Sequence, residues 1–142
     1  MRAASPEFFY FMRNADGRNP VAAVDAVTGA LVGPPELIPG VSFRPARPGE
    51  VVTLFGTGFG ATNPAFAPGE LPDRAAPVVE PVRVTIGGLE AETLYAGAAP
   101  GLAGVYQINL RIPAAAPNGD LPVTLRVGSF AAPPGGFLTV RR

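Results

Sequence analysis

The chain of 142 residues contains no cysteine, histidine, lysine or tryptophan, and it carries few charges. Without histidine, cysteine or lysine, the usual pairs of a nucleophile and a general base cannot be assembled, so we expect no enzyme. The eleven basic residues are all arginines, they are dispersed, and eleven acidic residues balance them. Nucleic-acid binding needs a basic patch or stripe, so we expect no nucleic-acid partner.

Long apolar runs are absent as well. No stretch reaches the roughly 18 apolar residues that indicate a membrane-spanning helix, so we expect no transmembrane segment. Residues 1–7 lack the apolar centre of a signal peptide, so an exported protein would contain this chain as a mature piece or an excised domain. The lack of cysteine says nothing about the redox compartment, because a sandwich of this size needs no disulfide.

Glycine and proline are abundant, with 18 residues of each. This composition approaches that of low-complexity chains, but 47% of the residues are hydrophobic and the net charge is zero. A chain with so much apolar material and so little net charge is expected to fold. The glycines and prolines therefore indicate turns between short strands in one domain, or in one domain with an extension.

Residues 49–60 organise the predicted fold, because a short apolar strand there runs directly into a glycine-rich corner. Val52 and Leu54 point to one side of this strand, and Phe55 points to the other. The corner glycines permit a positive φ or a close backbone approach, and Phe59 is expected to fold back beneath them and close one end of the core. The glycines of the corner are Gly56, Gly58 and Gly60.

Period-two alternation predicts several further strands, and no segment has a helical pattern. The pair Gly87-Gly88 indicates a tight hairpin. An apolar segment, residues 8–12, precedes a predicted pair of strands, and a proline-rich connector, residues 33–48, follows them with an edge strand at 41–43. The other predicted strands cover residues 21–26, 30–32, 82–86, 89–95, 105–112, 121–127 and 137–141.

Two sets of motifs carry a resemblance to known domains. Residues 48–60, PGEVVTLFGTGFG, resemble the opening of IPT/TIG immunoglobulin-like domains. Residues 94–101 and 104–113, with GDLPVTL at 119–125, are similar to the uncharacterised Solibacter-type C-terminal domain. The resemblance covers about residues 41–140 and implies a module at the C-terminus of a large exported bacterial protein, without catalytic residues. We therefore expect an all-β, immunoglobulin-like (IPT/TIG-type) β-sandwich over residues 41–142, preceded by an N-terminal strand and hairpin extension with a linker over residues 1–40.

The sequence offers two candidate chemical sites, a pair of carboxylates and a Ca²⁺ site, and each also has a simpler structural interpretation. Glu90 and Glu92 are expected on the same strand face, and paired carboxylates can hydrolyse glycosides, but a charged pair on an outward face is more often a solvated surface. Asn14, Asp16 and Asp25 carry the oxygen ligands that Ca²⁺ prefers. Their spacing is not that of a calcium loop, and Asn-Ala-Asp-Gly commonly forms a turn, so we expect no metal and no cofactor.

Two features could contact a partner. Phe55 and Phe66, together with the outward residues of the strand at 105–112, could form a polar and aromatic surface. The apolar segment at residues 8–12 either packs within its own sandwich or adds to the sheet of a neighbouring copy, and the sequence leaves both open. Its candidate contact residues are Phe8, Phe9, Tyr10 and Phe11.

The sequence thus predicts a non-catalytic structural or adhesive module, extracellular or on the cell surface, that contacts neighbouring modules or copies of itself. Strand addition is one way in which it could do so. The alternative is a carbohydrate-binding module of a secreted enzyme, with a glycan as its partner. Sugar-binding platforms usually need exposed aromatic rings, and the absence of tryptophan with only three tyrosines weakens this alternative.

Overall fold

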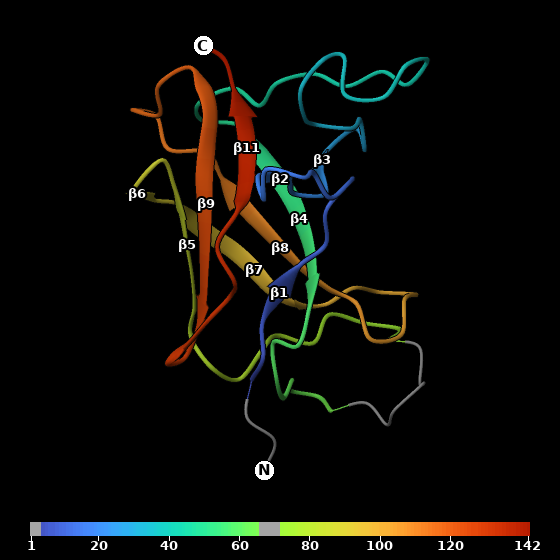
Figure 1. The fold of residues 1–142 in the computed structure, drawn as a ribbon. Helices are drawn as coiled ribbons and strands as arrows, with labels where there is room; N and C mark the ends of the chain where they lie inside the picture. The colour runs from blue at the N-terminus through green and yellow to red at the C-terminus, as the bar shows by residue number, and fades with distance from the viewer. Residues whose placement is uncertain (1–3, 66–71) are drawn as a thin grey trace.

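Two packed β-sheets form the fold of the computed structural model, which describes residues 4–65 and 72–142 (Figure 1). The first sheet has the order β1-β4-β8-β7, with β3 also paired to β4; the second has the order β2-β11-β9-β5-β6, with β10 paired to β9. The prediction of an all-β sandwich is therefore confirmed. The strands are β1 (Glu7–Phe8), β2 (Asn19–Pro20), β3 (Ala23–Asp25), β4 (Val51–Thr57), β5 (Val82–Ile86), β6 (Leu89–Glu90), β7 (Glu92–Ala98), β8 (Tyr106–Arg111), β9 (Gly119–Val127), β10 (Phe130–Ala131) and β11 (Gly136–Val140).

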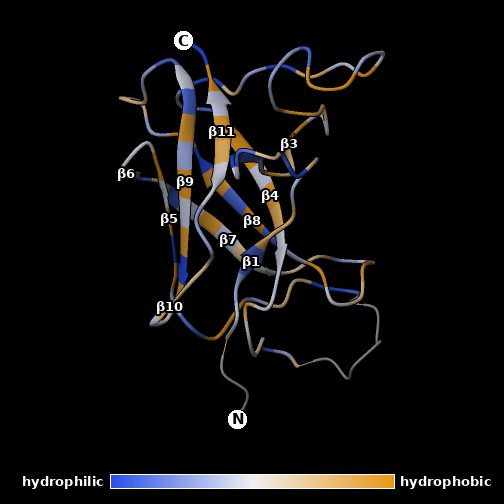
Figure 2. Ribbon diagram, viewed as in Figure 1, coloured by the Kyte–Doolittle hydropathy of each residue, from blue (hydrophilic) through white to orange (hydrophobic). Residues whose placement is uncertain are grey.

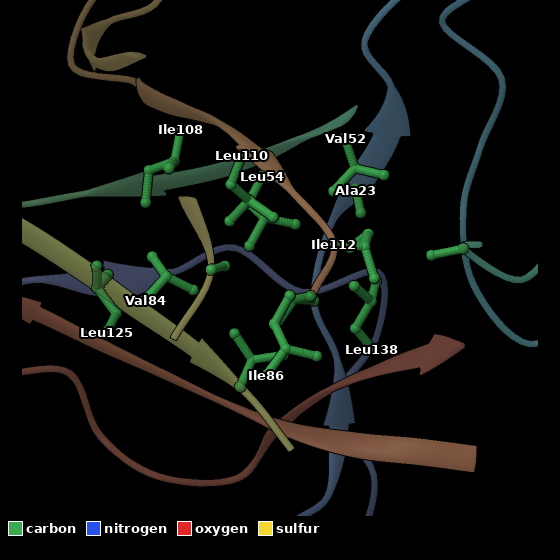
Figure 3. Close-up of a cluster of buried hydrophobic side chains, with 14 of the residues drawn as sticks. Ala23, Val52, Leu54, Val84, Ile86, Ile108, Leu110, Ile112, Leu125 and Leu138 are labelled. Atoms are coloured by element: carbon green, nitrogen blue, oxygen red, sulfur yellow. The ribbon is translucent and has the colours of Figure 1, made fainter. Parts of the chain in front are cut away.

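Strand β4 lies inside the first sheet, with β8 on one side and β1 and β3 on the other. Val52 and Leu54 are fully buried, and they pair with Leu110 and Ile108 of β8. Because side chains alternate across a strand, this register sends the residues between them to the outer face of the sheet. The inner row of the first sheet thus consists of branched apolar side chains from two adjacent strands (Figure 3).

Strand β9 is the central strand of the second sheet, and Figure 2 shows hydrophobic and hydrophilic residues alternating along it. Its odd-numbered residues from Leu121 to Val127 are buried, and its even-numbered residues are exposed. On one side β9 pairs with β5, and on the other it pairs with β11 and with β10. The buried side chains of the two sheets face each other and form one core (Figure 3).

The glycine corner follows β4 and closes one end of this core. Phe59 is fully buried and stacks on Tyr106, with 4.9 Å between the ring centroids. Gly58 has a φ of 75°, and a Cβ atom on it would lie 2.0 Å from the carbonyl oxygen of Ser5. On Gly56 a Cβ atom would lie 2.5 Å from the carbonyl oxygen of Glu7. These positions therefore exclude larger residues because the N-terminal segment passes directly over the corner. Gly60 also has a positive φ.

The hairpin at Gly87 and Gly88 forms, with φ values of 60° and 82° that suit glycine in a tight turn. The prediction of one continuous return strand after it is wrong. After β6 the chain leaves the second sheet at the buried Ala91 and continues as β7 in the first sheet, with a register shift between Thr93 and Tyr95. From Glu92 to Ala98 pairing with β8 replaces pairing with β5.

The N-terminal segment is part of both sheets. Strands β1 and β3 pair with β4, while β2 pairs in parallel with β11. Four side chains of this segment belong to the same core as those of the later strands. They are Phe8, Val21, Ala23 and Val32.

The proline-rich connector at residues 33–48 does not contain the predicted edge strand at 41–43. Instead, Phe43 packs edge-on against Phe11, with 5.0 Å between the ring centroids. Isolated bridges then join Arg44 to Val32 and Ala46 to Val140. Prolines lack a backbone N–H group, so this connector holds the rim of the sandwich by single bridges rather than by a regular ladder.

Candidate functional site

The outer face of the first sheet carries a set of polar and aromatic side chains, here called the amide–aromatic face: Phe9, Thr53, Phe55, Gln107 and Asn109. The register pairs Thr53 with Asn109 and Phe55 with Gln107, so these four residues are direct neighbours on β4 and β8. Phe9 follows the buried Phe8 and therefore points outward, and its N–H donates to the carbonyl oxygen of Phe55 at 2.9 Å. The strands thus present this set on one rigid surface.

Hydrogen bonds between the side chains fix the amides of this face. The hydroxyl of Thr53 donates to Oδ1 of Asn109 at 2.8 Å, and Nε2 of Gln107 donates to the same oxygen at 3.3 Å. With two donors on its oxygen, the Asn109 amide is held in one orientation, and its NH₂ group is not used by either bond. A preformed amide of this kind is suited to bind a partner, because little side-chain entropy is lost on contact.

The aromatic part of the face extends to a shallow hollow at its edge. Phe55 is half-buried, whereas Phe9 is 38% exposed. Phe9 also lines a hollow of about 370 Å³ together with Met12 and Thr57. At its rim Arg13 pairs with Glu7 at 3.1 Å and lies over the ring of Tyr10. Burial raises the pKa of Tyr10, and the neighbouring Arg13 opposes this shift.

The structure places some of the predicted partner-binding residues in the interior and others on the outer face of the first sheet. Phe8 lies in the core with 2% exposure, because it is the inward residue of β1, so its side chain is not available to a partner. Phe11 packs against Phe43, and Tyr10 lies beneath Arg13. Phe9 and Phe55 lie together on the outer face. Phe66 lies outside the described residues.

The three oxygen donors considered for Ca²⁺ are engaged within the protein. The carbonyl oxygen of Asn14 and Oδ1 of Asp16 accept backbone N–H groups of the turn at residues 14–18. Asp25 belongs to a second turn, where its Oδ1 accepts the N–H groups of Val27 and Thr28. In the described parts of the chain, no three residues of the types His, Cys, Asp or Glu form a group that could hold a metal ion.

Asp25 instead forms an ion cluster that the sequence did not reveal. Arg44 donates to Asp25 and, through both terminal nitrogens, to Glu50 at 2.9 and 3.1 Å. The backbone N–H groups of Thr28 and Val27, together with Arg44, hold the pKa of Asp25 below its ordinary value. Glu50 and Asp25 in turn raise the pKa of Arg44. This cluster ties β3, the proline-rich connector and the start of β4 together, so its role is structural.

We expect Asp25→Asn to remove part of the acid sensitivity of folding. Because the pKa of Asp25 is lower in the folded chain, its stabilisation is complete above the unfolded value of about 3.9 and is lost as the pH falls through the folded value. At about pH 7 the variant should lose about 1 kcal/mol of unfolding free energy. Urea midpoints at about pH 7 and about pH 3 measure the effect. Between these two pH values the midpoint of Asp25→Asn should fall less than the midpoint of the unmodified protein.

Asp73→Asn is the matched control, because the side chain of Asp73 is exposed. It should keep the acid dependence of the unmodified protein. The cluster would lose its assigned role if Asp25→Asn and the unmodified protein lost equal stability on acidification.

The two glutamates weighed as a catalytic pair are separated by the change of sheet at Ala91. Glu90 lies on β6 of the second sheet, 4.0 Å from Arg83, and Glu92 lies on β7 of the first sheet, 3.4 Å from Arg111. The expectation that they share one strand face is therefore wrong. Each carboxylate has an arginine on the adjacent strand and serves as an exposed cross-strand ion pair.

Comparison of the chain with protein-family models, curated proteins and solved structures gave no match. The resemblance to IPT/TIG domains therefore depends on the sequence motifs alone.

No helix within residues 4–65 or 72–142 is long and apolar enough to cross a bilayer. The alternation of residues along β8 predicted that Gln107 and Asn109 point outward. Their contact with Thr53 could not be predicted, because it depends on the pairing of β8 with β4, and the sequence of one strand does not reveal its neighbour.

Proposed function

We propose that the protein is a non-catalytic module that binds neighbouring modules or copies of itself through the amide–aromatic face. The observation that carries this proposal is the fixed Asn109 amide, held by Thr53 and Gln107 beside Phe55. Protein interfaces are enriched in aromatic residues and contain about one hydrogen bond per 100–200 Å². A rigid strand surface with both kinds of group matches this composition.

The proposed contact uses the face of the sheet rather than addition of a strand. The segment at the end of β1 is already paired within the same chain: the N–H of Phe9 donates to the carbonyl oxygen of Phe55, and the carbonyl oxygen of Phe9 accepts the N–H of Ala22. Addition of this segment to the sheet of a neighbouring copy would also withdraw Phe8 from the core of its own chain. Contact by the outer face requires neither change.

Two further parts of the proposal concern chemistry and location. The absence of histidine, cysteine and lysine supports a role without catalysis. The resemblance to C-terminal modules of exported proteins supports a place outside the cell or on its surface, where such a module would link larger proteins. Fractionation of cells with an antibody against this chain tests the location.

A carbohydrate-binding module is the second candidate. It is favoured by the exposed ring of Phe9 next to the hollow at the edge of the face. On a glycan array, binding that is lost in Phe55→Ala would support this candidate over protein contact.

Sedimentation equilibrium of the full chain tests the proposed contact. We expect concentration-dependent self-association, and we expect Phe9→Ser to weaken it about tenfold or more, which corresponds to about 1.4 kcal/mol. The matched control is Phe130→Ser, which removes a phenylalanine of similar exposure, 44%, from β10 of the other sheet. A chain that stays monomeric at all concentrations, or equal weakening by both variants, would count against this proposal.

A further inference from the structure

A second surface feature lies on the opposite sheet, where the pairing along β9 is interrupted. The register of β9 with β11 ends at Pro122, and its register with β10 begins at Arg126. Between β10 and β11 the chain bows away from β9 (Figure 2). This segment contains Pro133 and Pro134, which have no N–H group to donate to β9. A groove opens beside the interruption.

The groove consists of two adjoining hollows of about 290 Å³ each, which share the lining residues Val123, Thr124 and Pro134. Arg126 lines the first hollow and Arg18 lines the second. Among the described residues that line either hollow, none is acidic. Along β9 from Pro122 to Arg126 the groove extends for about 13 Å, enough for roughly four residues of an extended peptide. Its charge is therefore complementary to an anionic, elongated ligand.

At the Arg126 end of the groove, a second arginine that does not line the groove adds to the positive charge. Arg83 of β5 lies directly opposite Arg126 in the sheet. Like charges in directly opposite positions destabilise a sheet, so an anion between them would relieve a repulsion. Glu90 approaches Arg83 only to 4.0 Å, and both side chains are largely exposed, so this ion pair is weak. The adjacent pair on the same face, Thr85 and Thr124, are hydrogen-bonded to each other through their hydroxyls.

Arg18 lies at the other end of the groove, where two contacts position its guanidinium. Its guanidinium lies over the ring of Phe137 at 5.3 Å, and it donates to the backbone oxygen of Asp120 at 3.4 Å. The Asp120 carboxylate accepts the hydroxyl of Thr139 at 2.7 Å. The guanidinium of Arg18 has no carboxylate partner among its described contacts, and its charge remains available to a ligand.

We propose that this groove binds an extended, acidic peptide segment of a partner protein. The two guanidinium ends would bind carboxylates, while the prolines supply apolar walls and carbonyl oxygens that accept peptide N–H groups. A peptide is favoured over an acidic polysaccharide because the Phe137 ring is only 8% exposed beneath Arg18 and offers no open platform for a sugar. The groove lies on the second sheet and is independent of the amide–aromatic face, so the module would contact partners on two opposite sides.

A hexaglutamate peptide, titrated against the full chain and followed by amide NMR shifts, tests this proposal. We expect shifts along residues 122–126 and 131–137, and weaker binding as salt is added. Arg18→Gln and Arg126→Gln should each weaken binding about threefold to tenfold. Arg141→Gln removes the same charge beyond the end of β11 and should leave the affinity within about twofold. Urea midpoints verify that the variants fold.

Several results would overturn the proposal. Hexaglutamate that does not bind, or that binds no better than hexaglutamine, would show that the groove does not recognise acidic peptides. Equal weakening by Arg141→Gln would show unspecific attraction by charge. Polygalacturonate that shifts the same amides while hexaglutamate does not would assign the groove to acidic polysaccharides instead. Self-association through the other face is measured separately, so either proposal fails without the other.

Discussion

A chain that begins at Val41 is expected to remain unfolded under native conditions. It would lack β1, β2 and β3 and the side chains of Phe8, Val21 and Val32, which are buried in the shared core. Burying each of these side chains contributes about 1.5–3 kcal/mol, or roughly 5–9 kcal/mol together, against a typical net stability of about 5–15 kcal/mol. The loss would also expose the edge of β4 that β1 and β3 cover.

Circular dichroism and urea unfolding measure this result. The matched control begins at Ser5, because this chain keeps the whole of β1 and the described residue whose N–H donates to the carbonyl oxygen of Gly58 in the glycine corner. The control should unfold in one cooperative transition like the full chain. A chain from Val41 with the same strand spectrum and a cooperative transition would show that the sandwich does not depend on the N-terminal segment.

Phe59→Ala is expected to lower the free energy of unfolding by about 3–5 kcal/mol. The Phe59 ring is fully buried and stacked on Tyr106, whose hydroxyl donates to the carbonyl oxygen of Gly60 at 2.7 Å. The variant would leave a cavity at the end of the core and remove the support of Tyr106. Because burial raises the pKa of Tyr106, we also expect a more accessible tyrosine to titrate closer to its ordinary pKa.

Urea midpoints and the absorbance of tyrosine at alkaline pH measure these effects. Phe59→Leu should cost less, because it keeps most of the buried volume. Phe130→Ala is the surface control, since Phe130 is exposed, and it should change the stability by no more than about 0.5 kcal/mol. A loss of similar size in Phe59→Ala and Phe130→Ala would refute the role of Phe59 at the end of the core.

The strands that the sequence predicted well are those with a strong two-residue period. In β9 every second residue from Leu121 is buried, and in β8 Ile108 and Leu110 are inward, as the alternation indicated. This alternation of apolar and polar residues depends only on which face of the strand is buried, so it can be read from the sequence of the strand itself. The glycine corner was also predictable, because its spacing of small residues before Phe59 is unusual for a strand.

The features that the sequence did not reveal depend on contacts between distant segments. Nothing in the alternation of residues 89–95 shows that the chain changes sheets at Ala91. The Asp25–Arg44 pair joins residues that are neighbours only because β3 and the connector meet at the rim. Likewise, the Phe8–Met12 segment has an apolar pattern that fits packing in cis or in trans, and only its pairing with β4 and Val21 places it.

The amide–aromatic face depends on that pairing, because the N-terminal segment positions Phe9 beside Phe55. Native-state hydrogen exchange tests this most directly. We predict that the amides of Phe9, Ala22 and Val32, which are all hydrogen-bonded between segments, exchange with the free energy of global unfolding, like the amides of the central strands. Exchange of these three amides through a separate opening of low free energy, with β4 and β8 still protected, would contradict it.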